Sequence, residues 1–235
     1  MAKRLSIVLA MLLILGLTGC GAAGPRQTAP ADTPAAAPTP AATPAPTPTP
    51  VLELPAPTPK PVPVGEAMEI PAGEAGIAKM HDFECDGINR TYMLYLPEDL
   101  CEDAPLVFVL HGYLGFVSSF MGGTGMNAAA DKYHFGVVYP QGSSSRSEEF
   151  PGTHWNADFT FSDVDDIGFL TALAAHLQEH YGFSESETFA AGLSNGGFMC
   201  YTLAVRAPDT FRAIASVAGT MSKGTWDERD ITRAP

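Results

Sequence analysis

The residues best suited to chemistry form the run Gly-Leu-Ser-Asn-Gly-Gly at residues 192–197, between a short β-prone segment and a helical pattern. This is a G-x-S-x-G pattern, in which a serine on a tight, strained turn is held clear of a sheet. The following helix N-terminus directs backbone N–H groups toward an oxyanion that forms when the serine attacks a carbonyl. The pattern predicts Ser194 as a nucleophile, with Gly192 and Gly196 shaping the turn. A glycine-rich turn with a chance serine is the alternative, but it leaves the flanking elements unexplained.

A second motif, His111-Gly112-Tyr113, follows the continuously apolar segment 106–110. In a hydrolase with a serine turn of this kind, the loop after that strand supplies another oxyanion donor. We therefore expect the backbone N–H groups of Asn195 and Tyr113 to hold the oxyanion. His111 itself is expected to be a structural ring that is hydrogen-bonded to backbone, and not a catalytic base.

The segments that must position these residues alternate between strand and helix patterns. Asp86-Gly87 is a strong hairpin signal between two β-rich segments. Strands are predicted at residues 78–84, 89–96, 106–110, 136–139, 188–193 and 211–218. Helices are predicted at residues 127–133 and 195–207, and from Asp163 through an apolar stripe at Leu170, Leu173, Ala174 and Leu177. This alternation predicts an α/β fold with a mostly parallel sheet and helices on both faces.

Proline usage divides the chain. Fourteen of the 21 prolines lie within residues 22–64, so we expect residues 20–64 to form a Pro/Ala/Thr-rich extended tether and residues 65–235 to form one folded domain. The folded part carries 9 Lys and Arg against 24 Asp and Glu, a balance of −15. Nucleic acid and anionic membrane surfaces are poor partners for such a surface.

The N-terminus resembles a bacterial lipoprotein signal. Two basic residues precede a thirteen-residue apolar run, which is too short to span a bilayer as a helix. The run leads to Leu-Thr-Gly-Cys, so residues 1–19 are expected to be a signal peptide and Cys20 a lipid attachment site. The protein would then be secreted and lipid-anchored to the outer face of a membrane, touching the membrane only through the lipid. An ordinary secretory signal cleaved near residues 22–23 is the alternative.

Taken in order, the motifs resemble the polyhydroxybutyrate depolymerase and feruloyl esterase group of α/β-hydrolases. The resemblance covers about residues 78–220 and includes 89–92, 105–112, 137–142, 165–169 and 192–197. It implies a serine esterase without a cofactor, acting on a polymeric or oligomeric ester substrate. Within this group, a feruloyl or acetyl esterase acting on plant polysaccharide is preferred over a polyester depolymerase. Trp155 matches a tryptophan of the group, either lining the substrate cleft or packed within the loop.

The catalytic acid and histidine of such a hydrolase follow the serine in chain order, but no histidine follows Ser194. We therefore expect the α/β-hydrolase domain to be truncated before the last two of eight strands, and this chain alone to have doubtful activity. His154 is an alternative base. The alternative functions are a catalytically inactive, surface-tethered binding module and a prolyl oligopeptidase-like peptidase, although the latter normally carries a β-propeller for which this chain has no room.

Two patterns imitate metal sites, but no metal is expected. Residues 176–180 match H-x-x-E-H at the end of an amphipathic helix without a third ligand. Asp163, Asp165 and Asp166 resemble the start of a calcium loop, but the later ligand positions do not fit, so a helix N-terminus explains them better. Of the remaining cysteines, Cys85 and Cys101 are candidates for a disulfide, with Cys200 buried.

Overall fold

The computed structural model describes residues 65–145, 151–158 and 162–229. The predicted signal peptide at 1–19, the lipid site at Cys20 and the tether at 20–64 lie outside these residues. Within the described part, no helix combines the length and the apolar character needed to cross a bilayer.

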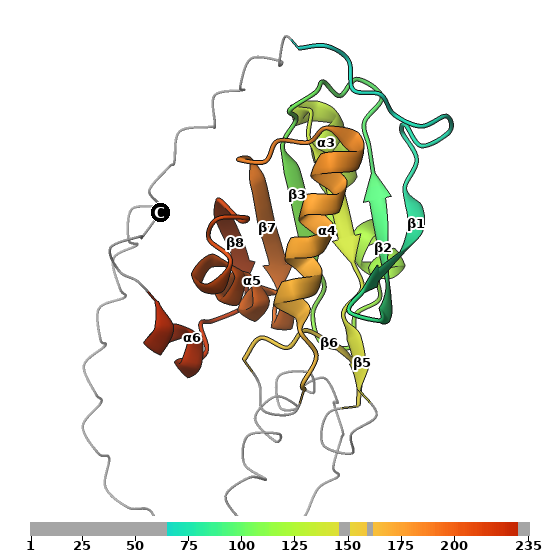
Figure 1. Ribbon diagram of the computed structural model, residues 1–235. Coiled ribbons are helices and arrows are strands. Elements are labelled where there is room, and N and C mark those ends of the chain that lie inside the picture. The colour runs from blue at the N-terminus through green and yellow to red at the C-terminus, as the bar shows by residue number, and fades with distance from the viewer. Residues whose placement is uncertain (1–64, 146–150, 159–161, 230–235) are drawn as a thin grey trace, which may run out of the picture. The chain divides into compact units, whose positions relative to one another are not determined.

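A six-stranded sheet forms the centre of the fold (Figure 1). Its strands are β1 (Lys79–Cys85), β2 (Ile88–Tyr95), β3 (Leu106–Leu110), β4 (Gly136–Pro140), β7 (Thr188–Leu193) and β8 (Ala213–Val217). They are arranged in the order β1-β2-β4-β3-β7-β8. β1 and β2 form the antiparallel hairpin predicted from Asp86-Gly87, and β2 is also antiparallel to β4. The pairs from β4 to β8 are all parallel, which confirms the predicted mostly parallel sheet.

Two apolar clusters cover the two faces of this sheet. Successive residues of a strand point to opposite faces, and Phe108 accordingly belongs to one cluster while Val109 belongs to the other. The larger cluster contains buried side chains of α4 (Asp166–Tyr181) and α5 (Asn195–Arg206), and the smaller contains Val117 and Ala130 from α2 (Val117–Thr124) and α3 (Met126–Tyr133). Figure 1 shows α4 lying across one face of the sheet. Helices therefore cover both faces, as the strand and helix alternation predicts.

Several local predictions were incomplete or wrong. The sequence patterns did not indicate α2, β5 (Ser143–Ser145), β6 (Gly152–His154) or α6 (Lys223–Glu228). α4 begins at Asp166 and not at Asp163, because the Asp165 side chain accepts a hydrogen bond from Gly168 N at 2.8 Å and caps the helix. No disulfide joins Cys85 to Cys101, so the candidate pairing is wrong. Cys200 is buried as expected, and its burial raises the pKa of its thiol.

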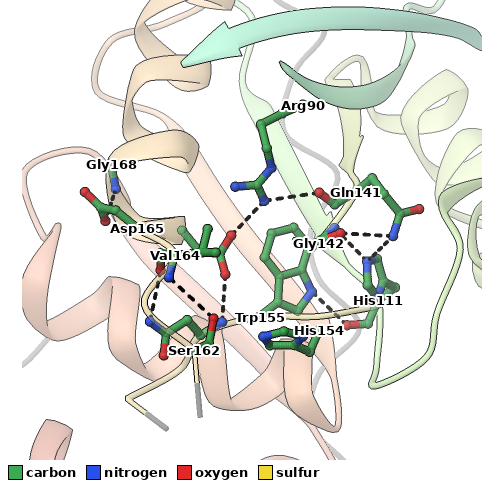
Figure 2. A network of polar contacts seen from close by, with 12 residues as sticks. Arg90, His111, Gln141, Gly142, His154, Trp155, Ser162, Val164, Asp165 and Gly168 are labelled. Atoms are coloured by element: carbon green, nitrogen blue, oxygen red, sulfur yellow. Dashed lines mark hydrogen bonds and ion pairs between the residues drawn. The ribbon is translucent and has the colours of Figure 1, made fainter. Parts of the chain in front are cut away.

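A buried ion pair joins β2 to the start of α4 (Figure 2). Arg90 Nη2 on β2 lies 2.7 Å from Asp166 Oδ1 at the start of α4, and both side chains are less than a tenth exposed. The same guanidinium donates to Gln141 O at 3.2 Å and lies over the Phe169 ring. The second carboxylate oxygen of Asp166 accepts a hydrogen bond from Asn156 N at 2.7 Å. Both charges are therefore partnered by hydrogen-bonding groups, which offsets the cost of removing them from water.

Replacing Asp166 by asparagine leaves the Arg90 charge buried without a counter-ion, so we expect the free energy of unfolding to fall by about 3–5 kcal/mol. Urea denaturation of the folded domain measures this loss. Asp227→Asn, which removes one carboxylate of an exposed ion pair with Lys223, is the matched control and is expected to leave the midpoint unchanged. Equal urea midpoints for Asp166→Asn and Asp227→Asn would show that the buried pair does not stabilise the fold.

Candidate active site

Ser194 occupies the turn between β7 and α5 with an unusual backbone conformation. Its φ is 52° and its ψ is −113°, a region that non-glycine residues rarely occupy and that costs about 1–3 kcal/mol. Two hydrogen bonds hold the turn, from Ser194 N to Val217 O at 2.8 Å and from Phe198 N to Ser194 O at 2.9 Å. The residue is exposed, so the turn keeps a hydroxyl accessible at the carboxyl end of β7.

Glycines permit the close approach that this turn requires. A Cβ on Gly196 would lie 2.3 Å from Leu110 O and 2.6 Å from His111 O. A Cβ on Gly192 would lie 2.3 Å from Gly196 O. The start of α5 is therefore pressed against the end of β3 and against β7, and no larger residue fits at either position.

The loop after β3 lies beside the serine. An added Cβ on Gly112 would be 3.6 Å from Ser194 Cβ, in ordinary van der Waals contact. Tyr113, the next residue, has an exposed side chain whose hydroxyl donates to Pro151 O at 2.6 Å. The structure thus places the loop that carries Tyr113 next to the turn that carries Ser194 and Asn195. The role of Tyr113 and Asn195 as oxyanion donors remains a prediction.

His111 is a buried structural ring, as the sequence indicates. Nδ1 lies 2.7 Å from Gly112 O, and Nε2 accepts a hydrogen bond from Gly142 N at 2.9 Å. These partners assign a neutral ring that is protonated on Nδ1. Burial lowers the pKa of His111, which agrees with that neutral form. Gln141 Nε2 lies 2.9 Å from His111 Nε2 and also donates to Gly115 O, so the Gln141 amide supports the loop after β3 (Figure 2).

Trp155 occupies the space between the loop after β3 and the serine turn. Its side chain is fully buried, and its indole N–H donates to His111 O at 2.9 Å (Figure 2). Its peptide group exchanges two hydrogen bonds with the Asn195 side chain. Of the two alternatives left open by the sequence, the packed tryptophan is correct. A buried indole N–H requires an acceptor, but the sequence alone does not identify which group accepts.

The other residues with possible chemistry lie elsewhere or have structural partners. His154 is buried on β6, with Nδ1 3.1 Å from Gly152 O. His176 and His180 are exposed on α4 and stack with ring centroids 5.7 Å apart, and partial desolvation of the His176 ring lowers its pKa. Across residues 65–145, 151–158 and 162–229, no three histidine, cysteine or acidic side chains are grouped so that they could hold a metal ion.

Apolar side chains are exposed in the two segments that meet at Ser194. Leu114 and Phe116, in the loop that follows Gly112, are more than half exposed. Leu193, the residue before Ser194, contributes to a cavity of about 530 Å³ that is lined mainly by apolar residues of β3, α2, β7 and β8. An apolar cavity next to a candidate nucleophile is typical of a binding site.

Gly196→Ala is expected to lower the free energy of unfolding by about 3 kcal/mol, because the new methyl group meets two backbone carbonyl oxygens that cannot move aside. Gly123→Ala is the matched control, since Gly123 is also a helical glycine but is exposed with nothing within 4 Å of an added Cβ. Gly123→Ala should raise the free energy of unfolding by about 0.5–1 kcal/mol. Urea denaturation of both variants makes the comparison, and an unchanged stability for Gly196→Ala would contradict the close approach described above.

Comparisons with known proteins agree with this arrangement. The model of a family described as Esterase PHB depolymerase matches residues 90–227. Feruloyl esterase B of Neurospora crassa is 26% identical over 62% of this chain and 49% of its own length. Poly(3-hydroxyalkanoate) depolymerase C of Paucimonas lemoignei is 25% identical over 61% of this chain and 34% of its own length. The chain therefore spans between a third and a half of the length of these relatives.

Solved structures show the same fold. An acetyl xylan esterase from Aspergillus awamori superposes with a TM-score of 0.52 at 21% identity, covering 66% of this chain and 56% of that one. At this identity the likeness concerns the fold alone. The described part of the chain has the α/β-hydrolase fold, with Ser194 at the turn after β7.

Proposed function

The chain belongs to the Esterase PHB depolymerase family, and on that basis we propose that the whole protein is a serine esterase that hydrolyses carboxylic esters. The observation that carries this proposal is the backbone of Ser194, which is held at a φ of 52° between a strand and a helix. A strained residue of this kind is retained where it serves a function. The exposed hydroxyl and the adjacent loop after β3 would supply the nucleophile and one oxyanion donor for acyl transfer.

In the proposed reaction, Ser194 Oγ attacks the ester carbonyl carbon. The carbonyl oxygen becomes an oxyanion, which accepts hydrogen bonds from the peptide N–H groups of Asn195 and Tyr113. Collapse of this intermediate breaks the bond between the carbonyl carbon and the leaving oxygen, which departs as the alcohol with the proton that Ser194 Oγ gives up, and an acyl group stays on Ser194. A water molecule then hydrolyses this acyl ester, which releases the acid and restores the Ser194 hydroxyl. The proposal assigns the general base to none of the described residues. His111 is unsuited to that role because both ring nitrogens already have backbone partners.

For the substrate, we propose feruloyl or acetyl esters on plant polysaccharide in preference to a polyester of the polyhydroxybutyrate type. The names of a feruloyl esterase and of acetylxylan esterases among the relatives support this class. The exposed apolar side chains of Leu114 and Phe116 offer a surface for an aromatic or alkyl acyl group.

We further propose that the protein is secreted and is anchored through a lipid on Cys20. The basic N-terminus, the thirteen-residue apolar run and the Leu-Thr-Gly-Cys sequence support this location. A proline-rich segment of this length would reach on the order of 130 Å if fully extended at ~3.1 Å per residue. An esterase held at that distance could act on a bulky polymer near the cell.

Fluorophosphonate labelling of the full-length protein tests the esterase proposal. We expect covalent labelling of the wild type, complete loss in Ser194→Ala, and no change in Ser118→Ala, which removes another exposed serine from the start of α2. The same proteins are then assayed on methyl ferulate, acetylated xylan and hydroxybutyrate oligomers. Hydrolysis of methyl ferulate and acetylated xylan that is lost with Ser194→Ala supports the proposed substrates. Hydrolysis of the hydroxybutyrate oligomers alone would instead indicate a polyester substrate. A folded wild type that neither takes the label nor hydrolyses an ester would favour the inactive binding module.

Metabolic labelling with a radioactive fatty acid tests the lipid anchor. We expect the label to remain with the protein in the membrane fraction and to disappear in Cys20→Ala, because that variant lacks the thiol that would carry the lipid. Cys101→Ala, which removes a thiol of the folded domain, is the control and should remain labelled. Unlabelled wild-type protein in the culture medium would instead indicate an ordinary secretory signal.

A further inference from the structure

Trp155 bonds to both segments that flank the nucleophile. On one side, its indole Nε1 donates to His111 O at 2.9 Å, and the two aromatic rings lie with centroids 5.1 Å apart. His111 is two residues before Tyr113, the predicted donor in the loop after β3. The indole therefore fixes the backbone at the point where that loop leaves the strand.

On the other side, Trp155 bonds to the residue that follows the nucleophile. Asn195 Oδ1 accepts a hydrogen bond from Trp155 N at 2.7 Å, and Asn195 Nδ2 donates to Trp155 O at 3.0 Å. Both bonds are buried, and the reciprocal pair determines the orientation of the Asn195 amide. Asn195, whose peptide N–H is the other predicted donor, is thus held by two hydrogen bonds to the same tryptophan.

Trp155 is itself held by the buried ion pair. Asn156, the next residue, donates its peptide N–H to Asp166 Oδ2 at 2.7 Å, and Asp166 is paired with Arg90. The Asn156 side chain also donates to Val164 O at 2.9 Å. These bonds tie the segment that carries Trp155 to the start of α4 and to β2. Trp155 is therefore hydrogen-bonded to both segments and lies in a part of the chain that is itself anchored to α4.

We propose that Trp155, together with the Asn195 side chain, is a positioning residue that sets the spacing between the two oxyanion donors. The inference rests on the proposed esterase function and adds residues that act through the donors without touching the substrate. Oxyanion donors are effective only within a few tenths of an ångström of their ideal positions. A displacement of about 1 Å near the reacting atoms costs about 100-fold in rate, so the link should control kcat and have little effect on substrate affinity.

Trp155→Phe in the full-length protein tests the link, because phenylalanine keeps an aromatic ring but lacks the indole N–H. On 4-nitrophenyl acetate we expect kcat to fall about 10- to 100-fold with KM within about 2-fold of wild type. The affinity of a boronic acid that forms a tetrahedral adduct with Ser194 should fall in parallel with kcat. The matched control is Trp226→Phe, which alters the chain's other tryptophan, half-exposed on α6, and should leave all three quantities unchanged.

Asn195→Ala provides an independent variant, because it leaves Trp155 in the core and keeps the peptide N–H of residue 195. It should show the same fall in kcat and in boronic acid affinity, with near-wild-type circular dichroism. Wild-type kcat in either folded variant, or a rise in KM without a fall in kcat, would overturn the positioning role while the esterase function stands. A wild type that takes no fluorophosphonate label and hydrolyses no ester would overturn the proposed function, and the positioning role with it.

Discussion

The close packing of the Ser194 turn against the end of β3 is the constraint on which the rest of the structure depends. The start of α5 lies so near β3 that a single methyl group on Gly196 would contact the carbonyl oxygens of Leu110 and His111. This packing, with the hydrogen bond from Ser194 N to Val217 O, holds Ser194 at a positive φ. The strain of about 1–3 kcal/mol is thus offset by contacts from β3, β7 and β8.

The same packing brings the loop after β3 next to the serine turn. Other groups must maintain the spacing between these two segments. Strand pairing fixes β3 beside β7, but it does not fix the loop that leaves β3. Gln141 contacts that loop at His111 and Gly115, and Trp155 donates to His111 O. Figure 2 shows the two contacts at His111. The buried pair of Arg90 and Asp166 anchors the segment next to Trp155. The charged pair is therefore linked to the serine turn through Asn156, Trp155 and Asn195.

The features that could be predicted from the sequence are those that neighbouring residues in the chain determine. The turn at Ser194 and the hairpin at Asp86-Gly87 were predictable because small residues at fixed spacing determine the backbone there. The start of α4 was misplaced by three residues, since any of the neighbouring aspartates could cap a helix. α2 was not recognised because Gly122 and Gly123 weaken its helix propensity. The role of Trp155 was not predictable, since its partners His111 and Asn195 are 44 and 40 residues away and only the folded chain selects them.

A crystal structure of the full-length protein with a phosphonate bound covalently to Ser194 tests most directly whether the serine turn and the loop after β3 form one catalytic site. We expect Ser194 to keep its positive φ. The phosphonyl oxygen should lie about 2.7–3.1 Å from the peptide nitrogens of both Asn195 and Tyr113. A phosphonyl oxygen directed into solvent, or a Ser194 with negative φ, would contradict the assignment of these two segments to a single oxyanion site.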